Sequence, residues 1–191
     1  MLVQRDQVAE VLPLLQAEAK KNRVGDPQDP ATTMGPVVNR AQFERIQRHI
    51  QIGITEGARL ICGGPGRPEG LAQGYYIRPT VFADVTPAMT IAQEEIFGPV
   101  LAVIPYTTVD EAIAIANGTP YGLGGYVWSS DRDTAYAVGA QLRAGRIFYN
   151  GAGSNNIAPM GGYKQSGNGR EMGVFGLEEY LEVKATIGFE G

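Results

Sequence analysis

Two adjacent carboxylates, Glu94 and Glu95, open the stretch EEIFGPV and run directly into an apolar pair and a Gly-Pro break. Charges beside a hydrophobic segment are costly unless water or a partner reaches them. One interpretation is a solvated acidic corner before a strand. The other uses the alternation of an extended segment, in which Glu95 and Phe97 share a face and Glu94 points away. A carboxylate accepts from two hydroxyls and a ring covers a flat heterocycle, so Glu95 and Phe97 suit a group such as a nicotinamide ribose.

The remaining residues with catalytic potential are few, because Cys62 is the only cysteine and His49 the only histidine. A single histidine argues against a Ser-His-Asp triad or a multi-histidine metal site. A reactive thiolate needs a nearby cation, base or helix N-terminus, and RLICGG offers none locally, so we interpret Cys62 as structural. His49 falls off the apolar stripe of its predicted helix, and we expect it to be partly exposed. The sequence therefore predicts no metal site.

Two glycine-rich stretches resemble phosphate-binding loops only in their glycine content. GGPGRPEG, residues 63–70, lacks the Gly-Lys-Ser/Thr ending that would meet phosphate and magnesium, and is predicted to be an exposed loop. SGNGREMG, residues 166–173, approaches a dinucleotide fingerprint, but no strand precedes it. Its glycines are expected to permit unusual backbone angles instead.

The first half of the chain alternates helical and extended patterns. An amphipathic helix is predicted from Asp6 to about Asn22, bent or delayed by Pro13. A second helix is predicted with Asn39 as its N-cap and Gly57 near its C-cap. RLICGG predicts a short buried strand. GYYIRPTVFADV predicts extended segments that are interrupted at a proline.

The second half carries a stronger pattern. VLAVIPY, residues 100–106, is almost continuously apolar, which is typical of a parallel strand covered on both faces. Thr108 and Glu111 form a capping box for a helix to about Asn117. Strands are predicted in GLGGYVWSS and GRIFYN, separated by a helix that Asp131 caps and that ends near Leu142. This order predicts βαβ units, a parallel sheet and one α/β domain.

Composition narrows the class of protein. The 191 residues are 43% hydrophobic and 19% charged, as in soluble globular proteins. The net charge of -4 argues against a nucleic-acid or anionic-membrane surface. No apolar run approaches the length of a membrane span, and the N-terminal region lacks the apolar core of a secretory signal. One cysteine excludes an internal disulfide and fits a reducing compartment, so we expect a cytoplasmic protein without nucleic-acid or membrane partners.

Five stretches, in their order and spacing, resemble motifs of the aldehyde dehydrogenase superfamily. They are GDPQDPATTMGP, GYYIRPTVF, EEIFGPV, NGTPYGL and PMGGYKQSGNGREMG, and the similarity extends from about Leu2 to about Ile187. The resemblance implies an α/β fold, a three-layer sandwich with a mostly parallel sheet. It also implies oxidation of an aldehyde to a carboxylic acid with NAD or NADP. In that family a cysteine thiolate attacks the aldehyde, hydride leaves for the nicotinamide, and a glutamate-activated water hydrolyses the thioester.

The resemblance also implies that part of the enzyme is absent. The chain looks like the C-terminal portion of the catalytic domain, beginning just after the segment that carries the nucleophile. The nucleophilic cysteine, the oxyanion-binding asparagine, the general-base glutamate and the main cofactor domain have no counterpart in it. Cys62 matches a position in the family that is not the nucleophile. We therefore expect no catalytic residue in this chain and no aldehyde oxidation by it alone.

Binding roles carry over to particular positions. Glu95 aligns with the glutamate that binds the nicotinamide ribose hydroxyls, and Phe97 with the aromatic residue that positions the nicotinamide ring. Gln42 and Arg45 align with positions near the adenosine half of the cofactor. Residues 151–160 correspond to the loop that lines the aldehyde tunnel, which places Gly153, Ser154 and Met160 there. Met160 stands where the family often has phenylalanine, so the tunnel should stay hydrophobic.

The expected domain organisation is a partial catalytic domain, residues 1–180, followed by an oligomerisation strand at 181–191. LEVKATIGF resembles the strand by which subunits of the family pair, which implies a homo-oligomer. Without its partner this strand would offer an unpaired edge. Two alternatives remain open: a truncated, non-enzymatic homologue that acts by association, and an independent thiol enzyme that uses Cys62.

Overall fold

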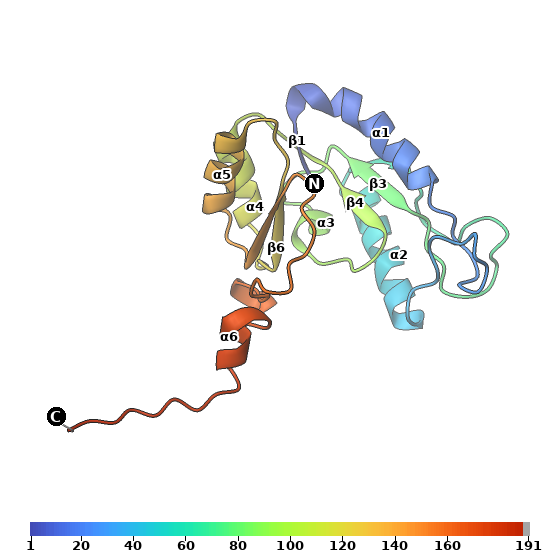
Figure 1. The fold of residues 1–191 in the computed structure, drawn as a ribbon. Coiled ribbons are helices and arrows are strands. Elements are labelled where there is room, and N and C mark those ends of the chain that lie inside the picture. Colours follow the sequence, from blue (N-terminus) through green and yellow to red (C-terminus); the bar gives the residue numbers. More distant parts are fainter. Residues whose placement is uncertain (189–191) are drawn as a thin grey trace. The chain divides into compact units, whose positions relative to one another are not determined.

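The computed structural model describes residues 1–188, and the chain divides into two compact units (Figure 1). Unit 1 comprises Met1–Ala112, and unit 2 begins at Ile113. Helix α4, Val109–Asn117, spans the boundary between the two. Both units contain parallel strand pairs, as the alternating pattern predicts.

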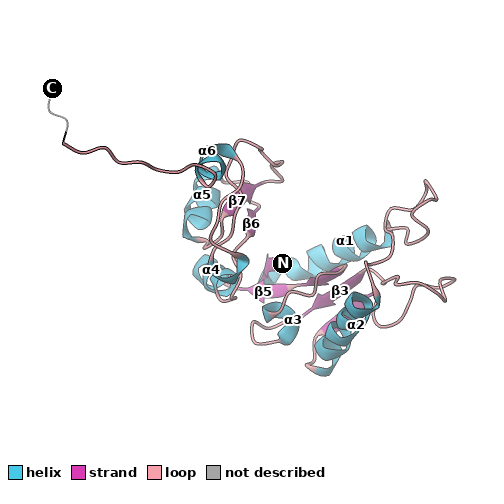
Figure 2. Cartoon of the chain, turned by 90° about the horizontal axis from the view of Figure 1, so that it is seen from below, coloured by secondary structure: helices cyan, strands magenta, loops and turns pink. Residues whose placement is uncertain are grey.

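Unit 1 has three layers, with a helix on each face of a three-stranded sheet (Figures 1 and 2). The strand order is β2-β3-β4, with β2 antiparallel and β4 parallel to the central strand. Helix α1 covers one face and α2 the other. The bounds are α1 Val8–Lys20, α2 Arg40–Thr55, β2 Arg59–Cys62, β3 Thr80–Ala83 and β4 Val100–Ala102.

The burial of the central strand β3 explains why unit 1 has a helix on each face of its sheet. All four of its residues are buried, so neither face can be left to water. Val81 and Ala83 belong to the cluster that packs against α1. Phe82 points the other way and lies close to Gly53 of α2. Because side chains alternate along a strand, burial of both sets requires a cover on each side.

The apolar run at 100–106 is split between two sheets. Its first part is β4, and its second part, β5 (Ile104–Tyr106), pairs in parallel with β1 (Leu2–Gln4). Val103 lies between them and is buried, and its backbone bonds Phe82 and Val85 instead of continuing either strand. The predicted single strand is therefore wrong in its continuity and correct in its parallel pairing, and only Val103 and Ile104 of the run are fully buried.

A second correction concerns RLICGG, which forms a strand but not a buried one. Among the described residues, strand β2 pairs only with β3 and lies at the edge of the sheet, so Leu60 remains 38% exposed. An aliphatic composition alone does not separate an edge strand from a central one, because edge position depends on the topology of the sheet.

Both predicted N-terminal helices form. Helix α1 accommodates Pro13 in its interior and follows a short 3-10 turn at Arg5–Gln7. Helix α2 is capped as expected, with the Asn39 side chain accepting a hydrogen bond of 2.9 Å from the Gln42 backbone N–H. Its buried side chains include Ile46 and Ile50, both fully inaccessible.

Unit 2 is built on one βαβ motif. Strands β6 (Gly124–Val127) and β7 (Arg146–Tyr149) pair in parallel and are joined through helix α5 (Arg132–Gln141). The Asp131 side chain caps α5 by accepting from the Thr134 backbone N–H at 2.9 Å. All three elements were predicted within a few residues, because their start signals are local.

The C-terminal region adds a 3-10 turn at Lys164–Ser166 and the short helix α6, Gly173–Glu178, which was not predicted. Residues 181–188, the described part of the expected oligomerisation strand, form no strand in the single chain, and 189–191 lie outside the described residues. A strand that pairs between subunits would need a second copy, so this expectation stays a prediction. Over positions 1–188, the helices are all too short or too polar to cross a membrane.

Candidate functional site

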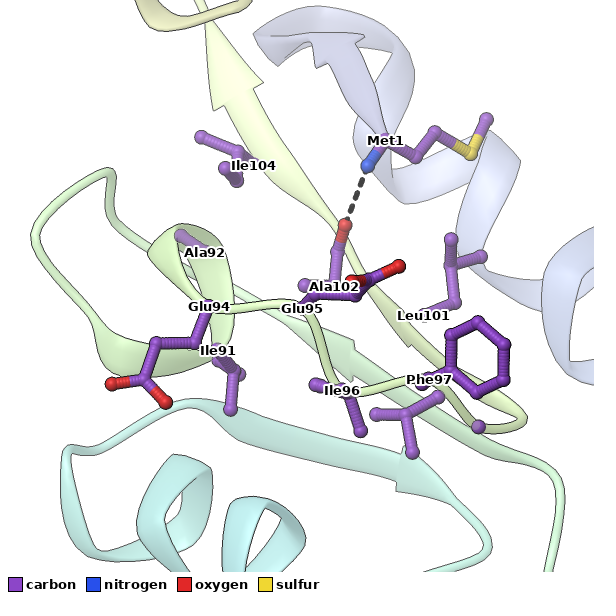
Figure 3. Close-up of a pocket in the computed structure, with 12 residues that line it drawn as sticks. Met1, Ile91, Ala92, Glu94, Glu95, Ile96, Phe97, Leu101, Ala102 and Ile104 are labelled. Atoms are coloured by element: carbon purple, nitrogen blue, oxygen red, sulfur yellow. Dashed lines mark hydrogen bonds between the residues drawn. The ribbon is translucent and has the colours of Figure 1, made fainter. Parts of the chain in front are cut away.

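The loop Glu94–Phe97 joins the short helix α3 (Thr90–Gln93) to the Gly-Pro turn that leads into β4. Figure 3 shows the Glu94 and Glu95 side chains pointing in opposite directions. Glu95 and Phe97 line a shallow hollow of about 340 Å³, whose apolar wall includes Ile91 and Leu101. The alternation expected from the sequence therefore agrees with the arrangement of the two carboxylates.

The hollow suits a sugar joined to a flat ring. Within residues 1–188, the Glu95 carboxylate has no hydrogen-bond or ion-pair partner, so both of its oxygens are available as acceptors. The Phe97 ring is 71% exposed, which leaves its face accessible. This combination offers two acceptor oxygens and an exposed aromatic face at one hollow.

Helix α2 holds this loop from behind. The Gln42 side-chain amide donates to two successive carbonyls, to Phe97 O at 2.7 Å and to Ile96 O at 3.1 Å. The Arg45 guanidinium donates to the Glu95 carbonyl. The structure thus brings Gln42, Arg45, Glu95 and Phe97 together, but the two helix residues contact the loop backbone, which motif reasoning did not anticipate.

His49 is a correction. It was predicted to be partly exposed, yet it is 6% exposed, because α2 packs against this loop as well as against the sheet. Its Nδ1 lies 2.9 Å from the Arg45 carbonyl and its Nε2 lies 3.1 Å from the Glu94 carboxylate. These two hydrogen bonds join the His49 ring to its own helix and to the Glu94 side chain. His49 therefore anchors the start of the loop.

Phe97 adopts a backbone φ of 57°, in the left-handed region that favours glycine. This conformation costs a non-glycine residue about 1–2 kcal/mol. The next residue, Gly98, sits so close to α2 that a Cβ there would lie 2.5 Å from Ile46 Cδ1. The sequence EEIFGPV does not predict this angle, because the left-handed conformation occurs at the aromatic residue and not at the neighbouring glycine.

The expected tunnel residues belong to unit 2. Gly153 and Ser154 are exposed in the segment after β7, and Met160 is half-buried, with its backbone paired to Glu171. Arg146 of β7 supports this segment by donating from Nε to the Pro159 carbonyl at 2.8 Å. Sequence reasoning missed Arg146, although a cation inside the strand GRIFYN was a usable signal.

Unit 2 also explains two of the sequence motifs. The Lys164 ammonium donates to the Asn117 and Thr119 carbonyls at 2.8 and 2.9 Å, and Ser166 Oγ accepts from the Gly122 N–H at 3.0 Å. These hydrogen bonds therefore hold GGYKQSG and NGTPYGL together.

Cys62 and the possible metal ligands are the remaining candidates. Cys62 is half-buried, and its thiol lies 4.0 Å from the Pro79 carbonyl. It borders a second hollow of about 540 Å³ together with Lys20 and Arg78. In the part of the chain that the structure describes, no three His, Cys, Asp or Glu side chains are grouped to hold a metal ion.

Comparison with known proteins identifies the family. The aldehyde dehydrogenase family profile matches residues 1–186. A Staphylococcus haemolyticus protein named "Putative aldehyde dehydrogenase" is 51% identical over 189 residues, covering 99% of this chain and 40% of that protein. A Staphylococcus saprophyticus protein of the same description is 54% identical over 167 residues, covering 87% of this chain and 35% of its own length. The chain belongs to the aldehyde dehydrogenase family.

Solved structures agree in fold. A mutant of aldehyde dehydrogenase C from Pseudomonas syringae, in complex with NAD+ and octanal, has a TM-score of 0.97 and 55% identity, covering all of this chain and 39% of that one. Mycobacterium tuberculosis aldehyde dehydrogenase with NAD+ has a TM-score of 0.90 and 46% identity, covering 97% and 40%. The fold is thus a partial aldehyde dehydrogenase catalytic domain, and the chain spans only 35–40% of these curated relatives and solved structures.

Proposed function

We propose that this chain forms part of an NAD- or NADP-dependent aldehyde dehydrogenase, which oxidises an aldehyde to a carboxylic acid, and supplies the nicotinamide side of its cofactor site. The observation that carries this proposal is the free Glu95 carboxylate beside the exposed Phe97 ring at one hollow. The NAD+ named in the two similar structures supports the cofactor class, and the octanal named in one of them supports an aldehyde substrate.

Each residue has a defined task in this proposal. Glu95 accepts hydrogen bonds from the two ribose hydroxyls and so fixes the sugar. Phe97 lies against the nicotinamide and limits its rotation. The bound cofactor supplies the hydride acceptor, and orientation of its ring relative to the substrate is what the protein contributes. Gly153, Ser154 and Met160 line the aldehyde path, with Met160 providing an adaptable apolar surface.

The catalytic groups of the reaction are proposed to lie outside this chain. The family's nucleophilic cysteine, oxyanion asparagine and general-base glutamate have no counterpart at the matching motifs. We expect the purified chain, mixed with an aldehyde and NAD+, to produce no rise in NADH absorbance. Robust turnover would show that the chemistry is assigned to the wrong residues.

The cofactor role is tested by Glu95→Gln in a full-length enzyme that carries this sequence, with NAD+ affinity measured by calorimetry. Hydrogen bonds to a charged group contribute about 1.5–3 kcal/mol, so the dissociation constant should rise about tenfold or more. Glu44→Gln is the matched control, because this exposed carboxylate of α2 does not line the hollow. An unchanged affinity in Glu95→Gln removes Glu95 from the site.

A second candidate function, association between chains, is favoured by the C-terminal segment. Tyr180, Val183 and Ile187 are 87%, 98% and 93% exposed in the single chain. Apolar side chains spaced along an extended segment are costly in water and suit pairing with a second strand. A homo-oligomer formed through residues 181–191 accommodates this segment, either in the complete enzyme or in a homologue that acts by association alone.

A further inference from the structure

We propose that Gln42 and Arg45 are positioning residues, whose side chains set the backbone of the Glu95–Phe97 loop, and that Gln42 fixes the turn at Phe97. The effect on the cofactor rests on the proposed function. The effect on the shape of the loop does not. In this view the donors of Gln42 and Arg45 face the protein backbone, and they affect the cofactor through the position of Glu95 and Phe97.

The double contact of Gln42 is the first argument. One side-chain nitrogen reaches both the Ile96 and Phe97 carbonyls, at 3.1 and 2.7 Å. In an extended backbone, successive carbonyls point to opposite sides, so a single donor could not reach both. In a helical turn of either hand they point the same way. The contact therefore excludes the extended conformation at Phe97 and requires a turn there.

The order of contacts along α2 is the second argument. Passing from Glu94 to Phe97, the loop is met in turn by His49, Arg45 and Gln42, which lie three or four residues apart and so on one face of the helix. The loop runs antiparallel to this face. Gly98 then lies against the buried Ile46, which closes the far side of the turn at Phe97. Each residue from 94 to 97 is thus hydrogen-bonded by a side chain of α2.

The exposure of Phe97 is the third argument. A left-handed angle on a non-glycine residue persists only where the surroundings impose it. The ring is 71% exposed, so packing of the side chain does little to impose it. The two hydrogen bonds from Gln42 act directly on the peptide groups flanking Phe97, which makes them the contacts best placed to hold the angle.

Another glutamine on the same helix provides a matched control. Gln47 is bonded to the backbone of a different loop, accepting from the Gly66 N–H at 2.6 Å and donating to the Gly66 carbonyl at 3.4 Å. A substitution there perturbs the same helix and a similar type of contact without touching Glu95 or Phe97. Gln47→Glu makes the same change of charge on the same helix, leaves the Glu95–Phe97 loop untouched, and still accepts from the Gly66 N–H.

The test measures the loop by NMR in the chain without cofactor. A positive φ brings the amide proton and Hα of the same residue close together and gives Phe97 a strong intraresidue NOE. We expect Gln42→Glu, which replaces the donor by a second acceptor facing the carbonyls, to weaken this NOE. Gln42→Lys, which restores a donor, and Gln47→Glu should both retain it. An unchanged NOE in Gln42→Glu overturns the proposal.

Two further measurements keep the outcome decisive. If Gln42→Glu does not fold, Gln42→Met has a similar length without any donor and is judged by the same NOE. In the full-length enzyme, Gln42→Glu should raise the KM for NAD+ several-fold with a smaller change in kcat, and Gln42→Lys should restore it. A loop that changes while the KM for NAD+ does not would confirm the positioning of the loop and contradict the proposed cofactor role of Glu95 and Phe97.

Discussion

The backbone of Phe97 combines an unfavourable angle with an exposed ring, and this makes it an informative residue to change. Replacement by glycine removes the penalty of about 1–2 kcal/mol for a left-handed non-glycine residue, while glycine itself loses about 0.5–1 kcal/mol more entropy on folding. Phe97→Gly should therefore be more stable than Phe97→Ala by about 0.5–1 kcal/mol, measured by urea unfolding. Equal stability of the two variants would indicate that the angle is not left-handed in solution.

Residue-level features differed in how far the sequence could predict them. The separation of Glu94 from Glu95 was predictable, because alternation is a local property of an extended chain. The burial of His49 and the contacts of Gln42 were not, since each joins residues about 45 to 55 positions apart. A helical stripe shows which face is apolar, but it does not show that a neighbouring loop covers part of the polar face.

At the scale of elements, helix α2 depends on its N-cap. Asn39 accepts from the backbone N–H of Gln42, the residue whose side chain holds the loop. Asn39→Ala should lower the free energy of unfolding by about 1 kcal/mol, because an orphan donor is left at the helix start. Asn39→Asp keeps an acceptor and should change stability little. A similar loss in both variants would show that the cap is not the cause.

The cap of helix α5 predicts a pH dependence. Hydrogen bonds from the Thr134 side chain and then its backbone hold the pKa of the Asp131 carboxyl below its usual value. The ionised Asp131 therefore stabilises the folded state fully at a pH above the pKa of the unfolded chain, about 3.9. This stabilisation is lost as the pH falls through the lower pKa of the folded state.

Asn at position 131 can still cap the helix but does not ionise. The other carboxylates are the same in both proteins, so their contributions cancel when the two melting temperatures are compared. We expect any advantage in melting temperature of the native chain over Asp131→Asn to shrink below about pH 4. A difference that stays constant down to about pH 2 would contradict this account.

Elements with strong local signals were predicted well, and those set by topology were not. The β6–α5–β7 motif was found because a capping aspartate and two apolar runs mark it. The split of residues 100–106 at Val103 and the edge position of β2 depend on which strand lies beside which. Neither is encoded in the apolar pattern of the segment itself, since a strand of either kind can carry the same residues.

At the scale of the whole molecule, the C-terminal segment predicts the state of assembly. Val183→Lys places a charge at a position that is 98% exposed in the single chain, so the fold should be unaffected. If residues 181–191 pair between copies, the variant should shift sedimentation of the full-length protein towards the monomer. Val38→Lys, at a position 83% exposed outside this segment, is the control and should leave the assembly unchanged. An unchanged mass for Val183→Lys would contradict pairing through this segment.

The alternative that Cys62 is a catalytic thiol would make this chain an enzyme by itself. Cys62 has only the Pro79 carbonyl as a hydrogen-bond acceptor among the described residues, at 4.0 Å. We expect alkylation of Cys62 at neutral pH to be no faster than that of free cysteine. Markedly faster labelling would revive the independent thiol enzyme.

The central claim is that the Glu95–Phe97 loop receives the nicotinamide ribose, and one titration tests it most directly. Nicotinamide mononucleotide contains only the half of NAD that this loop would contact, so it can be added to the chain while backbone amide shifts are followed by NMR. The account predicts saturable shifts that are largest at residues 95–98 and that are lost in Glu95→Gln. Largest shifts elsewhere in the chain, or shifts at this loop that persist in Glu95→Gln, would contradict it.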